Sequence, residues 1–475
     1  MRASVSTFSR WLARRPAVLA ASLFVASLSV AGIALRDLAE PSIRGDGVGY
    51  YAPLASWLVD RDLDLHNETA HLNRRYLTAA FMTPEGKLGN PFPVGPAHLW
   101  APLVYVVSLL PPNARLDAPI PERARTAHPA FAPRYARALL WTNQVLAVGA
   151  GAVLCAALAA SVGVWISVLA MLACVLGTPV FYYVLQEPSY GHAASFFAVS
   201  VWLTLVLVDR RRRLPLEVLG FTFGVVVLMR SQDVVLGVLL APRLIDAWKR
   251  RVPLAPWARG VPLVRLAWPA LLAFTPQMLF WKRIYGIPLL VPPGPDFLPA
   301  WKPHVLHLLF STWNGAAVWT PVLLLGFVGV ATMREPRLRL AFVVALALEI
   351  YSSAVIADWW GGRAFGPRRL VSIVPLLACG MAYALAAWRS HPRRLLAAVA
   401  FMAVACVWTL RLAEYQRRGL LPRNPGNAAD YVRHHVPGSR DALRYGHWDY
   451  PRLLRDAVAS ERLLRAENRR RGAAR

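Results

Sequence analysis

Residues 17–35 read AVLAASLFVASLSVAGIAL, and this stretch decides which class of protein the chain forms. A helix that crosses a bilayer needs roughly 20 mostly apolar residues, and this run has that length without a charged side chain. It follows the basic residues Arg2, Arg10, Arg14 and Arg15, as a secretory signal would. The apolar run is too long for a typical signal peptide, so we expect an uncleaved anchor whose N-terminus (residues 1–16) is cytoplasmic.

The composition extends this interpretation to the whole chain. Of its 475 residues, 56% are hydrophobic and 17% charged, whereas soluble proteins average about 45–50% and about 25%. Such hydrophobicity excludes a disordered chain, and four cysteines in so long a chain exclude a disulfide scaffold. The net charge of +27 would suit a nucleic-acid binder, but long apolar runs do not. We therefore expect an all-α polytopic membrane protein that binds no nucleic acid.

Further apolar runs predict about eleven transmembrane helices in a domain over residues 17–412. These runs are 135–160, 163–182, 193–208, 215–229, 233–247, 263–281, 316–333, 340–357, 370–388 and 395–412.

The run Ala97–Leu110 determines the topology. It is apolar but short, contains His98 and Pro102, and precedes two further prolines. If it crosses the bilayer, the main basic clusters lie outside; if it lies in the interface, they lie inside with the basic N-terminus. Cytoplasmic loops are the ones enriched in Lys and Arg, which favours an interfacial helix. The clusters concerned are Arg210–Arg213, Lys249–Arg251, Arg334–Arg339 and Arg389–Arg394.

Two segments then lie outside the cell membrane. Residues 36–134 form one large external loop that carries the interfacial helix, and its aromatic, polar composition is unlike that of a linker. The Arg-rich tail, residues 413–475, is also external by this count, since long segments cross largely regardless of charge.

A few basic residues fall on the external side, where positive charge is least expected. They are Lys282, Arg283, Lys302, Arg363, Arg368 and Arg369 in loops, and Arg230 at the end of the fifth predicted span. One interpretation is headgroup contact or snorkelling; the other is an anion site, because guanidinium groups match phosphate geometry. The stretch DWWGGRAFGPRR (358–369) favours anion recognition, since its glycines permit close backbone approach and its arginines supply charge.

Three acidic or polar features remain. In GDGVGYY (45–51), Asp46 between glycines either presents its carboxylate to a partner or forms a simple turn. In QEPSYGH (186–192), Glu187 and His192 either bind hydroxyls and tune a neighbouring base or serve as capping and hydrogen-bonding groups. Glu349 falls near the middle of the ninth predicted span, where an acid is by default a functional hypothesis.

Several stretches resemble the GT-C superfamily of polyprenyl-phosphate-sugar-dependent membrane glycosyltransferases. They are similar to the bacterial branch that includes protein O-mannosyltransferases and the lipid A aminoarabinose transferase. The layout matches over roughly residues 10–410, whereas the specific motifs cover a few dozen residues. The stretches are GDGVGYYAPLASWLVDRDLDLHNE (45–68), NPFPVGPAHLWAPL (90–103), LQEPSYGHAASFF (185–197), MRSQD (229–233) and DWWGGRAFGPRR (358–369).

This resemblance implies sugar transfer from a polyprenyl-phosphate donor to a hydroxyl of a lipid, glycan or protein acceptor. It implies inversion at the anomeric carbon, with Asp46 as the base, at the external or periplasmic face of the inner (plasma) membrane. Relatives often carry two adjacent acids, whereas Asp46 is followed by Gly47, and Glu40 or Asp37 are the candidates for a second carboxylate. Metal dependence varies among relatives and no convincing ligand set is present, so a divalent metal stays open and no cofactor is assigned.

The remaining roles are divided among the residues named above. The donor phosphate is assigned to Arg363, Arg368, Arg369, Lys282 and Arg283. Substrate contacts are assigned to Tyr50, Tyr51, Glu187, His192, Trp359 and Trp360, although interfacial anchoring explains such aromatic residues equally well. The main alternative is a transporter or lipid flippase without transferase chemistry, which usually shows related halves and several intramembrane charges. A third hypothesis is a non-enzymatic protein that acts as a partner in an assembly of the cell envelope.

Overall fold

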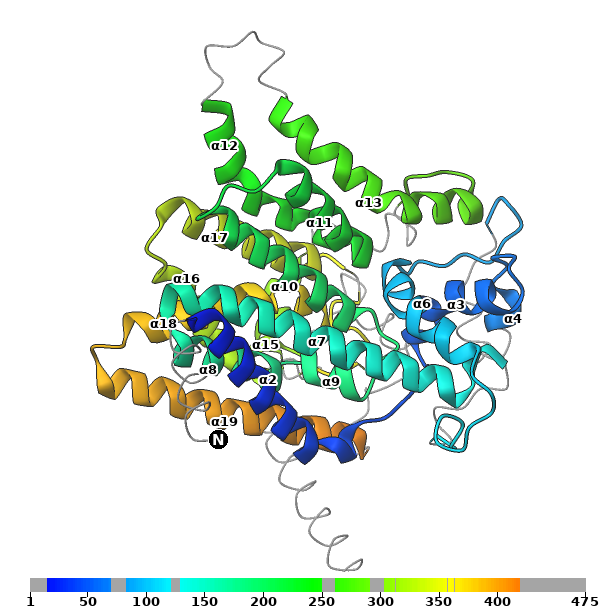
Figure 1. The fold of residues 1–475 in the computed structure, drawn as a ribbon, viewed down its shortest axis with the longest axis horizontal. Helices are drawn as coiled ribbons and strands as arrows, with labels where there is room; N and C mark the ends of the chain where they lie inside the picture. Colours follow the sequence, from blue (N-terminus) through cyan, green and yellow to red (C-terminus); the bar gives the residue numbers. More distant parts are fainter. Residues whose placement is uncertain are drawn as a thin grey trace, which may run out of the picture.

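A computed structural model describes residues 15–69, 83–120, 129–249, 261–290, 303–311, 313–356, 358–362 and 364–418. In these residues the regular elements are all helices, which confirms the prediction of an all-α polytopic membrane protein (Figure 1). Lys302, Arg363 and residues 419–475, which make up most of the C-terminal tail, lie outside the described residues.

Each predicted apolar run corresponds to one helix or to two consecutive helices. They are α2 (Pro16–Ala34), α7 (Pro133–Val162), α8 (Val164–Leu176) with α9 (Val180–Leu185), α10 (His192–Asp209), α11 (Leu216–Met229), η4 (Ser231–Leu240) with α12 (Ala241–Lys249), α13 (Val261–Tyr285), α15 (Ala316–Trp319) with α16 (Val322–Ala331), α17 (Pro336–Ala354), η7 (Arg368–Ile373) with α18 (Val374–Ala387), and α19 (Pro392–Arg417).

Six stretches of this set are long and apolar enough to cross a membrane: α2, α7, α10, α13, α19, and η7 together with α18. Breaks in two of the other runs follow prolines. Pro179 and Pro321 immediately precede α9 and α16. Proline lacks the N–H that an interior helical residue donates, so a helix restarts after it more readily than it continues through it.

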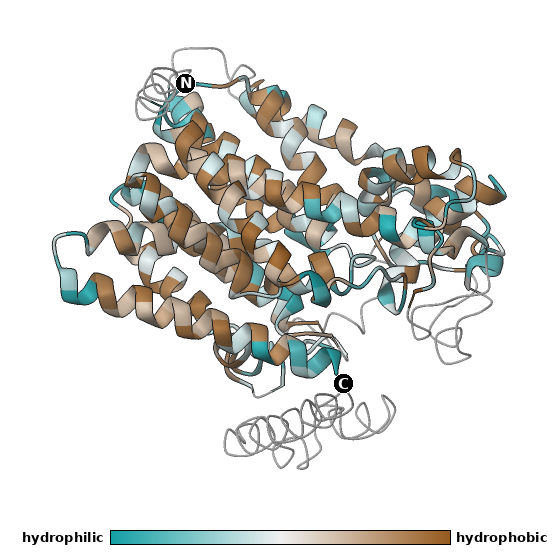
Figure 2. Cartoon of the chain, turned by 60° about the horizontal axis from the view of Figure 1, so that its bottom comes forward, coloured by the Kyte–Doolittle hydropathy of each residue, from teal (hydrophilic) through white to brown (hydrophobic). Residues whose placement is uncertain are grey.

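The helices differ in how much of their surface the protein covers. α10 and α18 are largely buried, whereas α2, α13 and α19 are mostly uncovered. On these outer helices the uncovered side chains include Ile33, Leu271 and Val404, all apolar. Figure 2 shows the same hydrophobic colouring along the helices and hydrophilic residues mainly at their ends. Uncovered apolar faces of this kind suit contact with lipid.

Glycines let two helix pairs approach closely. A Cβ on Gly220 of α11 would lie 2.0 Å from the Leu266 carbonyl oxygen of α13, and one on Gly329 of α16 would lie 1.8 Å from the Gly380 carbonyl oxygen of α18. Small residues at helix interfaces are the usual route to tight packing in membranes.

The Gly329→Ala substitution is expected to destabilise the protein. Its methyl group meets backbone, so the helices must separate, at a cost of about 1–3 kcal/mol. Thermal unfolding of the purified protein in detergent measures the effect. Gly149→Ala is the matched control, because a Cβ there meets nothing within 4 Å. Equal melting temperatures for the two variants would contradict the packing described.

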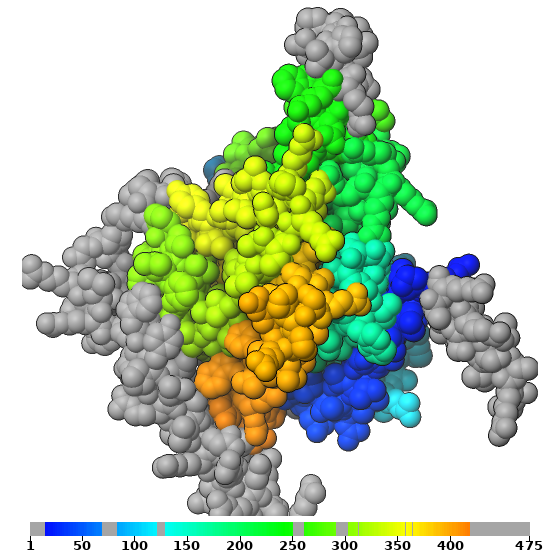
Figure 3. Space-filling view, turned by 90° about the vertical axis from the view of Figure 1, so that its left-hand side faces the viewer, coloured from blue at the N-terminus to red at the C-terminus, as the bar shows by residue number. Residues whose placement is uncertain are grey.

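Ion pairs join several basic loops at one end of the bundle, here called the basic end. Arg210, after α10, pairs with Glu335, before α17. Arg213 and Arg337 both bind Asp246 of α12, at 2.9 Å and 3.0 Å. Figure 3 looks onto this end, where segments distant in sequence adjoin. These contacts bring two of the four predicted basic clusters together, Arg210–Arg213 and Arg334–Arg339, and the side of the membrane that they face stays a prediction.

Most of the described residues between α2 and α7 form a compact lobe at the opposite end, here called the loop lobe (Figure 1). It contains α3 (Asp46–Val59), α4 (His66–Thr69), α6 (Gly95–Ser108) and η3 (Pro129–Phe131), whereas η1 (Arg36–Leu38) directly follows α2. Its core includes Tyr51, Trp100 and Phe131, and the Trp100 indole N–H donates to Asn143 Oδ1 of α7 at 2.9 Å. With 14 residues, α6 is about 21 Å long. A bilayer core is about 30 Å thick, so the helix is too short to span it.

Two further details complete the fold. The short helix α14 (Val305–Phe310) lies between α13 and α15. The last helix, α19, continues to Arg417 instead of ending at residue 412, and Glu414 pairs with both Arg417 and Arg418 along this added turn. Such pairs three and four residues apart stabilise a helix end.

Candidate functional site

Three segments far apart in sequence meet beside the loop lobe: the start of α3, the turn 186–191 and the loop 358–367. Asp46 is the first residue of α3, after Gly45, whose φ of 55° is one that glycine adopts readily. Asp46 Oδ2 accepts a hydrogen bond from Arg368 Nη1 at 2.6 Å. The Asp46 side chain is 25% exposed and that of Arg368 is 11% exposed, so the pair is sheltered but reachable.

The glycines around Asp46 reflect close packing and not only turn geometry. A Cβ on Gly47 would lie 1.9 Å from Ser189 Oγ, and a Cβ on Gly191 would lie 2.7 Å from the Tyr50 ring. The start of α3 and the 186–191 turn therefore approach so closely that neither glycine position has room for a side chain. The position after Asp46 therefore cannot hold a second acid in this arrangement.

Arg44 joins the same two segments by a network of ion pairs. Its Nη2 lies 2.9 Å from Glu187 Oε1, and its Nη1 lies 2.9 Å from Glu40 Oε1. Burial raises the pKa of Glu187 above its ordinary value, although Arg44 opposes the rise. Burial alone lowers the pKa of Arg44, but Glu187 and Glu40 outweigh it and raise that pKa. Glu187 and Glu40 thus hold Arg44, and this brings Asp46 against the 186–191 turn.

Removal of Arg44 is expected to destabilise the protein, and more so as the pH rises. In Arg44→Met, the largely buried Glu187 loses its ion pair and keeps the repulsion of Glu40, which costs about 3 kcal/mol once Glu187 is ionised. Uncompensated carboxyl groups have raised folded-state pKa values, so the stability they contribute at low pH is lost as the pH rises through those values. Thermal unfolding at pH 5 and pH 8 measures this. The control is Arg36→Met, because the Arg36 side chain and its partner Asp37 are both exposed. A decrease in the melting temperature of Arg44→Met that is equal at pH 5 and pH 8 would contradict this prediction.

An aromatic group supports Arg368. Its guanidinium carbon lies 5.7 Å from the centre of the Tyr190 ring, within range of a cation–π interaction. The Tyr183 ring lies 4.4 Å from that of His192 and 5.6 Å from that of Tyr190. Tyr183 also donates its hydroxyl to the Phe365 carbonyl at 3.2 Å, which ties the 358–367 loop to this group.

The neighbouring Arg369 closes the 358–367 loop on itself. It pairs with the Asp358 carboxylate and also donates to the Asp358 carbonyl oxygen. Trp359 is buried, with its ring 5.7 Å from that of His307, and the Trp360 carbonyl accepts a hydrogen bond from Asn314 Nδ2 at 2.8 Å. These contacts give Arg369 and Trp359 a structural role in shaping the loop in this conformation.

The two adjacent tyrosines of α3 differ. Tyr50 is half-buried, with its ring 4.7 Å from that of Phe92, and burial and then Asp46 raise its pKa. Tyr51 is completely buried and donates its hydroxyl to the Ala130 carbonyl at 2.9 Å. Tyr51 therefore belongs to the core of the loop lobe and presents no ring face to a sugar in this conformation, whereas Tyr50 borders Asp46.

The other predicted groups lie apart from Asp46 or have local partners. Lys282 and Arg283 are exposed on the last turn of α13, and no hydrogen bond or ion pair among the described residues joins them to Asp46. The acidic run 60–64 forms a turn, in which Asp62 accepts from Ser56 Oγ and from the Asp64 N–H. Within the described residues no group of three metal-ligating side chains occurs.

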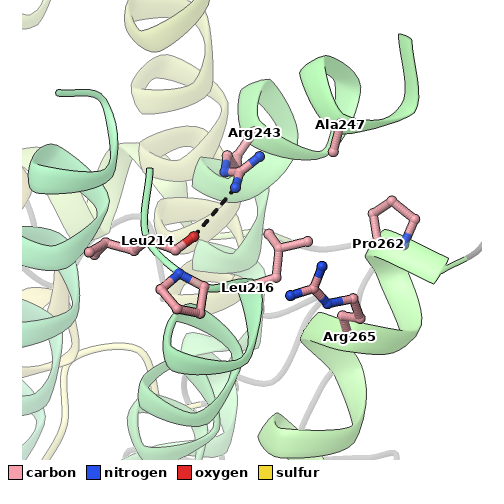
Figure 4. Close-up of a pocket in the computed structure, with 7 residues that line it drawn as sticks. Leu214, Leu216, Arg243, Ala247, Pro262 and Arg265 are labelled. Atoms are coloured by element: carbon pink, nitrogen blue, oxygen red, sulfur yellow. Dashed lines mark hydrogen bonds between the residues drawn. The ribbon is translucent and has the colours of Figure 1, made fainter. Parts of the chain in front are cut away.

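A cavity of about 200 Å³ lies away from this site, near the basic end (Figure 4). Its lining includes Arg243 and Arg265. Arg243 pairs with Asp209 and donates to the Leu214 carbonyl, and Arg265 pairs with Glu217. Both guanidinium groups are thus already neutralised by acids.

The comparisons with known proteins give structural overlaps alone. No family model matches the sequence, and no curated protein matches it. Two crystal structures of the Archaeoglobus fulgidus oligosaccharyltransferase overlay on the chain. The complex with Zn and sulfate has a TM-score of 0.45 at 14% identity over 85% of this chain and 53% of that chain. The apo form has a TM-score of 0.44 at 13% identity over 85% of this chain and 55% of that chain. The chain spans about half the length of those archaeal chains.

Proposed function

We propose that the chain is an integral-membrane glycosyltransferase that transfers a sugar from a polyprenyl-phosphate donor to an acceptor hydroxyl. The observation that carries this proposal is the contact between Asp46 and Arg368, which are 322 residues apart in sequence. A base for the acceptor and a cation for the leaving phosphate are the two groups that such a transfer needs. The resemblance of the surrounding motifs to the GT-C superfamily adds the lipid-linked donor and the external face of the membrane.

The proposed reaction is a single displacement. The acceptor oxygen forms a bond to the anomeric carbon while the bond from that carbon to the phosphate oxygen breaks. Asp46 takes the acceptor proton, and the phosphate leaves with the electron pair of the broken bond. Arg368 stabilises the negative charge that develops on the phosphate. Attack opposite the leaving group inverts the anomeric centre, so no second nucleophile is required.

The ion pair also explains how the site stays neutral before a donor binds. In that state Arg368 neutralises the charge of Asp46, and both side chains are largely buried. A guanidinium offers five N–H donors in a planar fork that suits a phosphate. When a donor phosphate engages Arg368, the carboxylate of Asp46 is released to accept a proton. The lipid tail of the donor would lie along the uncovered apolar helices.

The direct test is transfer of a labelled sugar by the purified protein in nanodiscs that contain a polyprenyl-phosphate sugar. We expect a covalent product and release of polyprenyl phosphate in equal amounts. The acceptor class follows from whether the label enters lipid, glycan or protein.

A transporter or flippase is the second candidate, and one observation favours it. Arg230, Asp233 and Glu349 form a cluster of charged side chains between helices, with both acids completely buried. Intramembrane charges of this kind mark ion or substrate pathways in many transporters. Counterflow of a lipid-linked sugar in vesicles, with no covalent product, would support this function and exclude the transferase.

A further inference from the structure

The buried cluster of Arg230, Asp233 and Glu349 lies beside η7, which begins with Arg368. Arg230 Nε is 3.9 Å from Asp233 Oδ1, and Arg230 Nη1 is 4.0 Å from Glu349 Oε1. Neither acid forms an ion pair with any other base in the part of the chain that the structure describes. Two ionised acids and one guanidinium would leave a net negative charge buried among apolar helices, which is energetically costly.

Each of the two acids has one carboxyl oxygen that accepts a hydrogen bond and one that does not. Glu349 Oε1 accepts from Gln232 Nε2 at 3.1 Å, and Asp233 Oδ2 accepts from Ser195 Oγ at 2.9 Å. The other two oxygens, Asp233 Oδ1 and Glu349 Oε2, are buried and have no hydrogen-bond partner among the described residues. The two carboxyl groups are neighbours, because each lies within 4.0 Å of the same Arg230 guanidinium. A proton between them would provide the missing donor and balance the charge of Arg230.

The same cluster holds the backbone of η7. Arg230 Nη1 donates to the Arg369 carbonyl oxygen at 2.7 Å and to Ser372 Oγ at 3.0 Å. Ser353 Oγ donates to the same Arg369 carbonyl at 3.3 Å. That carbonyl belongs to the residue after Arg368, so fixing it also fixes the direction in which the Arg368 side chain leaves the backbone.

We propose that Asp233 and Glu349 share one proton and that the resulting neutral cluster with Arg230 positions Arg368 against Asp46. The positioning role rests on the proposed function, whereas the shared proton does not. Asp233, Glu349 and Arg230 are positioning residues, since each acts on the substrate only through Arg368.

Infrared spectroscopy of the full-length protein in nanodiscs tests the shared proton. At pH 9 we expect the carbonyl stretch of one protonated carboxyl group, which disappears in both Glu349→Gln and Asp233→Asn. Glu68→Gln is the control, because burial and then Asp60 raise the pKa of Glu68 only to about 8, so this group is ionised at pH 9. If the wild-type protein and Glu349→Gln show the same absorption in this band, the proposal of a shared proton is wrong.

Hydrogen exchange and kinetics test the positioning role. Each single variant keeps one negative charge opposite Arg230, whereas the double variant Asp233→Asn/Glu349→Gln keeps none. We expect the double variant alone to show faster exchange in the peptide 364–373, with α16 unchanged. Its kcat/KM for the donor should fall about 100-fold, as displaced catalytic groups typically cause, while the KM for the acceptor stays constant.

The outcomes separate the two proposals. Unchanged exchange in peptide 364–373 would overturn the positioning role, and so would a double variant that merely adds the effects of the single ones. If the wild-type protein transfers no sugar, the proposed function fails, and the infrared and exchange results still decide the cluster.

Discussion

The substitution Asp46→Asn is expected to lower kcat for sugar transfer by about 10²–10⁴, the usual contribution of a general base. Asparagine has the same shape and its side-chain oxygen can still accept the hydrogen bond from Arg368 Nη1, but the amide cannot take a proton from the acceptor. Binding of the donor should therefore change much less than kcat. Initial rates with a labelled polyprenyl-phosphate sugar in nanodiscs measure the effect.

The control for this substitution removes a comparable carboxylate from the same lobe. Asp117 Oδ2 lies 2.6 Å from Arg134 Nη2, and no hydrogen bond or ion pair among the described residues joins this pair to the 186–191 turn or to the 358–367 loop. Asp117→Asn should keep kcat, even if it lowers the melting temperature. A wild-type kcat in Asp46→Asn would remove this carboxylate from the chemistry.

The substitution Arg368→Gln is expected to lower kcat by about 10²–10³, in the range found when one donor to a developing negative charge is removed. The KM for the donor should rise as well, because the guanidinium also binds the phosphate of the ground state. Arg368→Lys should recover part of the rate, since it restores the charge but not the planar fork. Steady-state kinetics with varied donor concentration separate these effects.

A charge swap distinguishes a chemical role of this ion pair from a structural one. The double variant Asp46→Arg/Arg368→Asp keeps opposite charges in contact but exchanges base and cation. We expect its melting temperature to approach that of the wild type while transfer stays absent. Recovery of transfer in the swapped variant would mean that the pair only holds the segments together.

The sequence predicted the helices well because their signal is local. A run of about 20 apolar residues can form a membrane helix wherever it occurs. The prolines that break several runs are also visible, although the sequence does not tell which of them divides a helix. Helix α6 was predicted to lie in the interface because that layout places the basic clusters inside, and its length of 14 residues suits a helix that does not span.

The candidate site was predicted in part, because its chemistry is local but its assembly is not. Asp46 and Arg368 were singled out separately by glycines and by charge on the unexpected side of the membrane. The role of Arg44 was missed. The sequence did show two signals for it, a base two residues before Asp46 and the single acid Glu187 in the segment 186–192. Nothing in the local sequence shows that these groups touch across more than 140 residues.

Two other differences have simple physical causes. Tyr51 and Trp359 were predicted to face substrate because aromatic side chains are frequent in sugar sites, yet both are buried. Tyr51 belongs to the core of the loop lobe, and large aromatic side chains supply much of the area that such a small core can bury. Trp359 instead packs against His307. Asp233 was quoted within the motif MRSQD but was assigned no role, because a position between two apolar runs is typical of a solvated helix end.

A structure of the protein with a bound polyprenyl monophosphate tests the central claim most directly. We predict phosphate oxygens within hydrogen-bonding distance of the Arg368 guanidinium, with the Asp46 carboxylate released from it and facing the same space. Phosphate bound at the basic end, near Arg243 and Arg265, with the Asp46–Arg368 ion pair intact, would contradict the account.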